Sequence, residues 1–343
     1  MLEAVLPSIP RSEAPVTAVM MRAAVVHEPG GPDVLKIEER PLPQVRPGWA
    51  LVRIHAFGLN RSELLTRAGD SGDAVRFPRV LGIECVGEVA DADPATLARG
   101  QTVVAAMGGM GRDYDGGYED YALLPVASVI PVRTTLSWAE LGAVPETFGT
   151  AWGSLQTLDL REGQLLLIRG GTSSVGMAAI TLAKGRDVRV IATTRQEAKR
   201  AALEANGADH VVIDDGTIAA AVRAIAPAGV DALLELVGPK TIVDSFRALR
   251  AGARACLTGF LEAVWDDASA LAEAKALGIE LRRFGSNVIN RDTYGGIFQT
   301  IIDGIESGHY RLRVDRTFPL ADIADAHRYM EANGAAGKVV GLT

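Results

Sequence analysis

Cysteine, basic runs and long apolar runs are all scarce in this 343-residue sequence. Its two cysteines, Cys85 and Cys256, are far apart and lack the close spacing of metal ligands, so we expect buried thiols rather than a disulfide or a zinc lobe. No run of Lys and Arg reaches five, and the net charge is −7. A nucleic-acid partner is therefore not expected, because the phosphate backbone selects for clustered positive charge.

No apolar stretch approaches the roughly 18 residues that cross a bilayer. The first twenty residues lack both the basic start and the apolar centre of a secretion signal. We therefore expect a cytoplasmic protein without a membrane partner. Residues 1–20 are interpreted as an N-terminal extension, because the first strand-like stretch, MRAAVVHEP, begins at Met21.

The chain length suggests about two domains. Residues 21–145 show short β-type runs cut by turns, which predicts a β-rich, partly barrel-like domain. Residues 146–286 alternate short apolar strands with Ala-rich helical stretches. That alternation predicts an α/β fold with a Rossmann-type doubly wound parallel sheet. Residues 287–343 are expected to return to the first domain.

The stretch IRGGTSSVG at 168–176 follows an apolar strand and opens a helix. It matches the dinucleotide fingerprint with Ser in place of the middle Gly, so backbone N–H groups at a helix N-terminus can hold a pyrophosphate. A tight turn without a ligand is the alternative. The predicted cofactor-binding residues of this turn are Gly171, Ser173, Ser174, Val175 and Gly176.

The second strand of the alternating region ends at Thr194 and Arg195, without the acidic residue that binds the ribose of NAD. Arg195 and Lys199 could pair with a 2′-phosphate and Thr194 could donate a hydrogen bond, each charge-assisted bond being worth roughly 1.5–3 kcal/mol. We therefore predict NADPH as the cofactor. The alternative is that these cations lie on a solvated helix start.

From Met21 to Thr343 the chain resembles the medium-chain dehydrogenase/reductase superfamily, in its zinc-independent quinone oxidoreductase branch. The resemblance rests on AFGLNRSELLTRAG at 56–69, FPRVLGIECVGEV at 77–89, PETFGTAWGSL at 145–155 and GKVVGL near the end. It implies a GroES-like catalytic domain formed by the N-terminal region and the C-terminal tail, with the cofactor in the cleft beside the nucleotide domain. The resemblance also implies a homodimer that forms through the last strand of the nucleotide domain.

Zinc-dependent relatives carry a Cys and a Gly-His-Glu segment where this sequence has Asn60-Arg61-Ser62 and Gly82-Ile83-Glu84. Both ligands are missing, so no metal is predicted. The resemblance assigns catalytic roles to Asn60 and Arg67; a helix cap and a solvated charge are the alternatives.

Further cofactor contacts are expected at Thr150 by resemblance, and at strand ends at Val237, Thr258 and Phe260. Together these features predict an NADPH-dependent reductase that passes hydride to small quinones or α,β-unsaturated carbonyls without zinc. An NADP-linked alcohol dehydrogenase is one alternative. A non-enzymatic NADPH-binding protein resembling zeta-crystallin is another, because a fold does not guarantee turnover.

Overall fold

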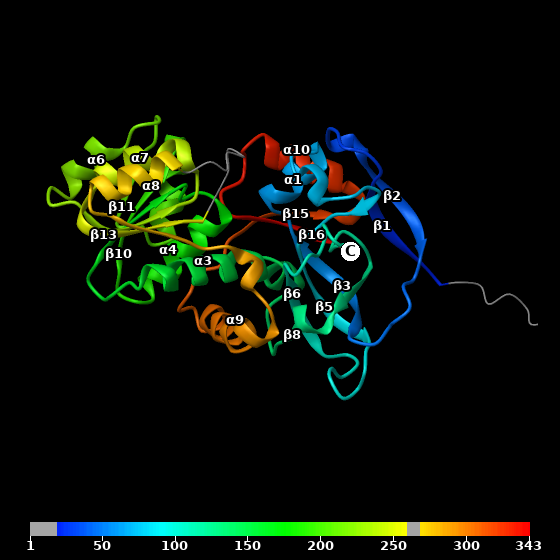
Figure 1. The fold of residues 1–343 in the computed structure, drawn as a ribbon. Coiled ribbons are helices and arrows are strands. Elements are labelled where there is room, and N and C mark those ends of the chain that lie inside the picture. The colour runs from blue at the N-terminus through cyan, green and yellow to red at the C-terminus, as the bar shows by residue number, and fades with distance from the viewer. Residues whose placement is uncertain (1–18, 259–267) are drawn as a thin grey trace, which may run out of the picture.

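The computed structural model describes residues 19–258 and 268–343, which form two lobes (Figure 1). One lobe contains a six-stranded sheet with the order β11-β10-β9-β12-β13-β14, in which every pairing is parallel. Counted along the chain, this order is 3-2-1-4-5-6, the Rossmann arrangement. The strands are β9 (Leu165–Arg169), β10 (Arg189–Thr194), β11 (His210–Ile213), β12 (Val230–Glu235), β13 (Leu249–Leu257) and β14 (Glu280–Arg283).

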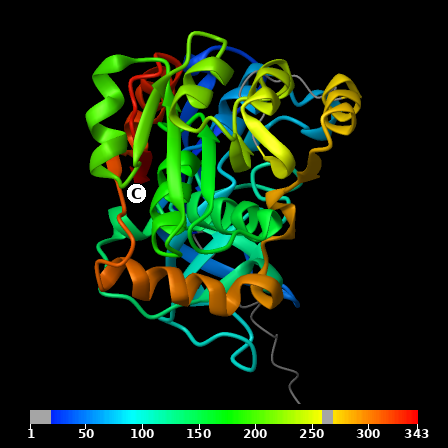
Figure 2. The ribbon, with the colours of Figure 1, turned by 90° about the vertical axis from the view of Figure 1, so that its left-hand side faces the viewer.

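Helices flank this sheet on both sides, as Figure 2 shows. Burial from both sides explains why β9 is apolar almost throughout, with all five residues buried. The prediction of a doubly wound parallel sheet is confirmed. The helices of this lobe are α3 (Pro145–Leu158), α4 (Ser174–Lys184), α5 (Arg200–Ala205), α6 (Ala219–Ile225), α7 (Pro239–Arg247) and α8 (Ala268–Ala276).

The helix predicted to follow the 168–176 stretch is α4, which begins at Ser174. The helix α7 ends at Arg247, because β13 already begins at Leu249. Two helices of this lobe, α3 and α8, were not predicted from the sequence.

The other lobe is β-rich and largely antiparallel. A seven-stranded sheet has the order β15-β16-β3-β5-β6-β8, with β7 paired to β3, and a three-stranded sheet has the order β2-β1-β4. The strands are β1 (Met20–Val26), β2 (Leu35–Pro41), β3 (Trp49–Gly58), β4 (Arg79–Val80), β5 (Glu84–Asp91), β6 (Thr102–Ala106), β7 (Tyr121–Pro125), β8 (Val129–Pro131), β15 (Val314–Pro319) and β16 (Lys338–Leu342).

The C-terminal segment returns to this β-rich lobe. β16 pairs with β3 in antiparallel register, with Val340 opposite Gly58. The start of β16 therefore lies beside the end of β3 and the helix that follows, α1 (Arg61–Ala68). The remaining helices are α2 (Trp138–Leu141), α9 (Arg291–Glu306) and α10 (Ile323–Glu331). Every helix in the described part of the chain is too short or too polar to serve as a membrane span.

Candidate active site

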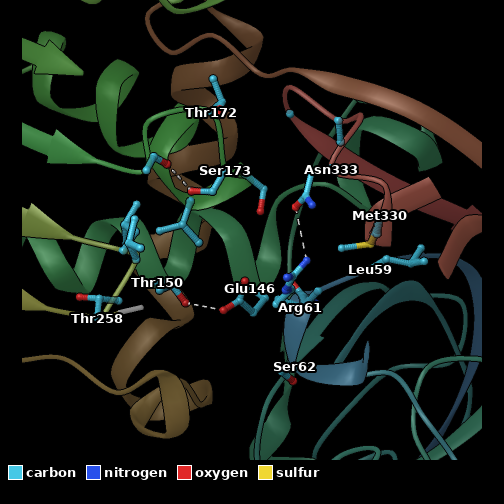
Figure 3. Close-up of a pocket in the computed structure, with 18 of the residues that line it drawn as sticks. Leu59, Arg61, Ser62, Glu146, Thr150, Thr172, Ser173, Thr258, Met330 and Asn333 are labelled. Atoms are coloured by element: carbon cyan, nitrogen blue, oxygen red, sulfur yellow. Dashed lines mark hydrogen bonds between the residues drawn. The ribbon is translucent and has the colours of Figure 1, made fainter. Parts of the chain in front are cut away.

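A cavity of about 1000 Å³ lies between the two lobes. Its wall on the parallel-sheet side comes from the carboxyl ends of β9, β10 and β12, which is where ligands bind in open α/β sheets. The opposite wall comes from the start of α1, from Met330 near the end of α10 and from the segment between α10 and β16, including Asn333. Figure 3 shows Thr150 and Glu146 of α3 between these two walls. A ligand in this cavity would contact both lobes.

The turn between β9 and α4 is shaped by close backbone packing. Gly170 has a φ of +88°, in the left-handed region that glycine tolerates best. A Cβ atom at Gly176 would lie 2.5 Å from the Gly170 carbonyl oxygen, and one at Gly171 would lie 2.9 Å from Ala192 Cβ. These two glycines therefore allow α4 and β10 to approach the turn. Neither of them lines the cavity, so they act by packing rather than by facing a ligand.

Ser173 is the N-cap of α4, and its hydroxyl is fully engaged. The hydroxyl donates to the Gly170 carbonyl at 2.7 Å and accepts from the Gly176 N–H at 3.1 Å (Figure 3). Capping therefore uses the hydroxyl proton, so Ser173 shapes the turn rather than donating this proton to a phosphate. The backbone N–H groups of Ser174 and Val175 have no acceptor within the helix, since they lie in its first turn. Both residues line the cavity, so this turn fits the pyrophosphate of a dinucleotide.

The end of β10 contributes Thr194 and Arg195 to the cavity wall. Thr194 accepts the Gln196 N–H on its hydroxyl at 3.2 Å, which fixes the direction of the turn. Arg195 is exposed and faces the cavity. Lys199 also lines the cavity, but its ammonium donates to the carbonyls of Asn333 and Ala335 at 2.8 and 2.7 Å. Lys199 therefore joins the two lobes, and Arg195 is the cation of this turn that faces the cavity.

Two acidic residues at the end of β11 also line the cavity and were not anticipated. Asp214 forms a two-point contact with the guanidinium of Arg169, at 2.8 and 2.7 Å. Arg169 is completely buried and also contacts Asp244 at 3.3 Å. Asp215 accepts the backbone and the side chain of Thr217, and these hydrogen bonds lower its pKa. The only sequence signal for this network is a charged residue at the end of an otherwise apolar strand.

The remaining predicted cofactor residues lie at the ends of β12 and β13. Val237 lines the cavity and donates its N–H to the buried Glu235 at 3.0 Å. Thr258 lines the cavity, and its hydroxyl lies 2.9 Å from that of Ser154 in α3. Phe260 lies outside the described residues.

Asn60 lines the cavity from the residue before α1. Its amide nitrogen donates to Glu84 at 2.9 Å and to Glu63 at 3.2 Å, and its oxygen accepts from Lys338 at 2.6 Å. The alternative interpretation, a helix cap, is not supported, because the side chain forms no capping hydrogen bond. The amide of Asn60 is therefore used within the protein rather than directed at a ligand.

We define Glu63, Glu84, Glu146 and Lys338 as the buried charge cluster, which lies directly behind Asn60. Lys338 lies 2.6 Å from Glu84, and the two side chains are 1% and 0% exposed. Glu84 also accepts the backbone N–H of Glu146 at 2.7 Å. Burial raises the pKa of Glu63 to about 7, and burial also raises the pKa of Glu146.

Three carboxyl groups in this cluster share one ammonium, which can compensate the charge of one carboxylate. Any further buried carboxylate would lack a counter-charge, and that is costly. One oxygen of Glu63, Oε2, is buried without a hydrogen-bond partner. Burial therefore favours protonated carboxyl groups in this cluster, and Glu146 is the carboxyl group of the cluster that faces the cavity.

Arg67 is placed differently from the prediction. It is buried but does not line the cavity. Its guanidinium donates to the Gly30 carbonyl at 3.0 Å, contacts His327 at 3.2 Å and pairs with Glu331 of α10. Burial, followed by the charge of Arg67, lowers the pKa of His327 to about 3, so this histidine stays neutral. These contacts fasten α1 to α10, and they are neither the predicted catalytic contact nor the solvated charge of the alternative.

Two further cations lie at the α1 end of the cavity. Arg61 reaches Asn333 at 3.5 Å (Figure 3), and Arg112 reaches the hydroxyl of Ser62 at 3.2 Å. The Nε atom of Arg112 is buried without a hydrogen-bond partner. This end of the cavity is therefore positively charged and rich in donors. Arg112 was not among the residues predicted from the sequence.

The residues at the positions where zinc-dependent relatives carry their ligands do not fit zinc. Within residues 19–258 and 268–343, no group of three or more His, Cys, Asp or Glu side chains is arranged to hold a metal ion. Asn60 and Glu84 instead contact the ammonium of Lys338, which supplies the positive charge behind the cavity. The site thus combines an anion-binding turn with a donor-rich end.

A dinucleotide-type turn on a Rossmann sheet, facing a second lobe across one cavity, defines a class of nucleotide-dependent enzymes. Two family models match the chain: the alcohol dehydrogenase GroES-like domain over residues 46–134 and zinc-binding dehydrogenase over residues 206–340. Quinone oxidoreductase of Rattus norvegicus is 26% identical over 333 residues, covering 94% of this chain and 97% of the relative. The Homo sapiens quinone oxidoreductase is 25% identical over 331 residues, with the same coverage.

Solved structures agree with these relatives. AibC has a TM-score of 0.84 at 27% identity, covering 98% of this chain and 99% of that protein. Mycobacterial Rv1454c complexed with NADPH has a TM-score of 0.83 at 26% identity, and an NAD-dependent alcohol dehydrogenase has 0.83 at 27%; each comparison covers 94% of this chain and 100% of the other. The chain belongs to the medium-chain dehydrogenase/reductase superfamily, with quinone oxidoreductases among its relatives, and it is an oxidoreductase.

Proposed function

We propose that this oxidoreductase uses NADPH to reduce quinones or α,β-unsaturated carbonyls without zinc. The observation that carries the proposal is the cavity itself, which joins the pyrophosphate-type turn and Arg195 on one lobe to a donor-rich end on the other. Such a cavity can hold an extended dinucleotide and a small acceptor in contact with each other. Bound NADPH would supply the hydride.

The residues of this chain would hold the cofactor along the parallel-sheet wall. The first-turn N–H groups of Ser174 and Val175 suit the pyrophosphate. Thr194 and Arg195 suit the 2′-phosphate, because Arg195 is exposed at the cavity and carries a full positive charge. Val237, Thr258 and Thr150 would line the path toward the nicotinamide end. Glu235 accepts the Val237 N–H and fixes the loop that positions this part of the wall.

Acceptor reduction needs donors where negative charge develops on the carbonyl oxygen. Asn60 is already bonded within the protein, so the donors that suit this task are Ser62 and Arg112. The positive charges of Arg61 and Arg112 favour the same build-up of charge on the substrate. Such stabilisation requires no Lewis acid.

The cofactor assignment is tested by replacing Arg195 with Ala. We expect the ratio of kcat/KM for NADPH to that for NADH to fall about 10- to 100-fold, the equivalent of one charge-assisted hydrogen bond. Arg189→Ala is the matched control, because Arg189 is exposed at the opposite end of the same strand and lies outside the cavity wall. A wild-type protein that favours NADH, or an Arg195→Ala variant with an unchanged ratio, would contradict the assignment.

The reaction class is tested by following NADPH oxidation with quinones, enones and nitroalkenes, with and without a chelator. We expect turnover that the chelator leaves unchanged. An alcohol dehydrogenase is the second candidate, favoured by the structural similarity to the NAD-dependent alcohol dehydrogenase. Oxidation of saturated alcohols that a chelator abolishes would support that candidate instead.

We also propose a homodimer, as the family resemblance implies. β14 (Glu280–Arg283) lies at one edge of the six-stranded sheet, next to β13 only. An open edge of this kind can pair with the same edge of a second copy. The mass of the protein in solution, measured by light scattering, tests this proposal.

A further inference from the structure

Glu146 occupies an unusual position for a charged residue, because it belongs to the buried charge cluster and also faces the cavity. Its side chain lies in the first turn of α3 and is largely buried. The hydroxyl of Thr150, one helical turn further on, donates to Glu146 Oε1 at 2.8 Å (Figure 3). Both residues line the cavity, and no other hydrogen bond engages the Thr150 hydroxyl among the described residues. The two groups thus form a short hydrogen-bonded path that opens into the cavity.

We propose that Glu146 supplies, through the hydroxyl of Thr150, the proton that completes the reduction of an enone. A hydroxyl can accept a proton from a neighbouring acid while donating its own, so Thr150 can pass the proton on without changing its charge. This inference rests on the proposed function, and it names the proton donor which that function leaves open.

The proposed reduction of the enone balances in electrons and protons. Hydride from NADPH forms a C–H bond at the β carbon of the enone, the C=C electrons shift to the carbonyl oxygen, and NADP⁺ results. The enolate then forms a C–H bond at its α carbon with the proton of Thr150, which takes the proton of Glu146. Glu146 is left as a carboxylate and regains one proton from solvent. The sum is enone plus NADPH plus H⁺ giving saturated ketone plus NADP⁺.

The surroundings of Glu146 raise its pKa and so favour its protonated form. Burial raises its pKa, and the charge of Glu84 raises it further, while Lys338 and the Thr150 hydrogen bond oppose the rise. An acid of this kind suits proton donation, because the best catalytic pKa lies near the working pH. The charged and titratable groups facing Glu146 are Glu63 of α1, Glu84 of β5, Lys338 of β16 and, across the cavity, Arg61 and Arg112.

The first experiment follows deuterium incorporation at the α carbon when a 2-substituted cyclic enone is reduced in D₂O. We expect the wild-type protein to give mainly one α-epimer. Glu146→Gln and Thr150→Val should each lower kcat about 100-fold and give both epimers, because water then protonates the enolate from either side. Thr150→Ser, which keeps the hydroxyl, should restore the single epimer. Glu146→Gln should also remove the fall of kcat at alkaline pH.

Glu119→Gln is the matched control. Glu119 is a second buried carboxyl whose pKa burial raises well above its usual value, but it lies outside the cavity wall. This variant should keep both kcat and the single epimer. The second experiment needs no cofactor: the infrared spectrum of the wild-type protein minus that of Glu146→Gln should contain the C=O band of a protonated carboxyl group at neutral pH. NADPH affinity, measured by fluorescence, should stay within twofold in the Glu146→Gln and Glu119→Gln variants.

Three results would overturn the inference. The first is a Glu146→Gln or Thr150→Val variant that keeps the single epimer and a kcat within threefold of wild type. The second is the absence of a protonated-carboxyl band from the difference spectrum. The third is a wild-type protein that gives both epimers. Failure of the proposed function looks different, because the wild-type protein would then oxidise no NADPH with any acceptor, and the proton assignment would fall with it.

Discussion

Replacing Lys338 with Met should destabilise the protein strongly. Lys338 lies 2.6 Å from Glu84 and 2.6 Å from the amide oxygen of Asn60, and it is almost completely buried. At an effective dielectric constant of about 20, two unit charges at this separation attract each other by about 6 kcal/mol. The net loss should be smaller, about 3–5 kcal/mol of unfolding free energy, because the variant no longer has to dehydrate an ammonium.

The assay is urea unfolding followed by circular dichroism at pH 5 and pH 8. The deficit of Lys338→Met should shrink at pH 5, because the carboxyl groups left without a counter-charge take up protons more readily there. Adding Glu84→Gln to Lys338→Met should recover at least half of the loss, since the uncompensated charge disappears. Lys184→Met is the control: its pair with Asp209 is about one-third exposed and should contribute about 1 kcal/mol or less.

A loss of unfolding free energy below about 1 kcal/mol for Lys338→Met would contradict a costly buried ion pair between Lys338 and Glu84, because truncating such a pair costs several times more. The same conclusion follows if the double variant is no more stable than the single one. Either result would mean that Glu84 does not depend on the charge of Lys338 in the folded protein.

Two further predictions concern Glu63 and Arg67. Because burial raises the pKa of Glu63 from 4.5 to about 7, the folded protein holds this proton longer than the unfolded chain and loses up to about 3 kcal/mol of stability as pH rises between these values. Glu63→Gln should reduce this loss, measured as the difference in unfolding free energy between urea titrations at pH 4.5 and 7.5. An unchanged difference would argue against a raised pKa of Glu63. Arg67→Lys should lower the unfolding free energy by about 2 kcal/mol, because Lys cannot keep all three contacts. The variant should keep the kcat of the wild type at temperatures where it is folded. A variant that is as stable as the wild type but has lost its kcat would support a catalytic role for Arg67.

The alternation of strands and helices after Pro145 was sufficient to predict the Rossmann sheet, because apolar runs flanked by glycine turns leave few alternatives. The helix α4 follows from its N-cap serine and its Ala-rich sequence. The helix α3 was missed because Gly149 and Gly153 lower its intrinsic propensity. A Cβ at Gly153 would lie 2.1 Å from Phe284, so tertiary packing rather than local preference selects these glycines.

The site was only partly predictable. The turn after β9 and the end of β10 carry local signals, so Ser174, Val175, Thr194 and Arg195 could be singled out from their positions along the chain. No local signal predicted that Lys199 would bond to the segment between α10 and β16. Arg67 was misplaced for the same reason, because its partner Glu331 lies 264 positions away.

Local sequence patterns were enough to predict the class of fold, the glycine-serine turn before α4 and the absence of the zinc-ligand residue types, because each depends on residues that lie close together in the chain. The buried charge cluster could not be predicted in this way, because it depends on contacts between distant segments. Glu63, Glu84, Glu146 and Lys338 come from α1, β5, α3 and β16, and the pairing of β16 with β3 brings Lys338 to Glu84. Burial then sets their protonation, since the cost of a charge depends on the surroundings that the fold creates.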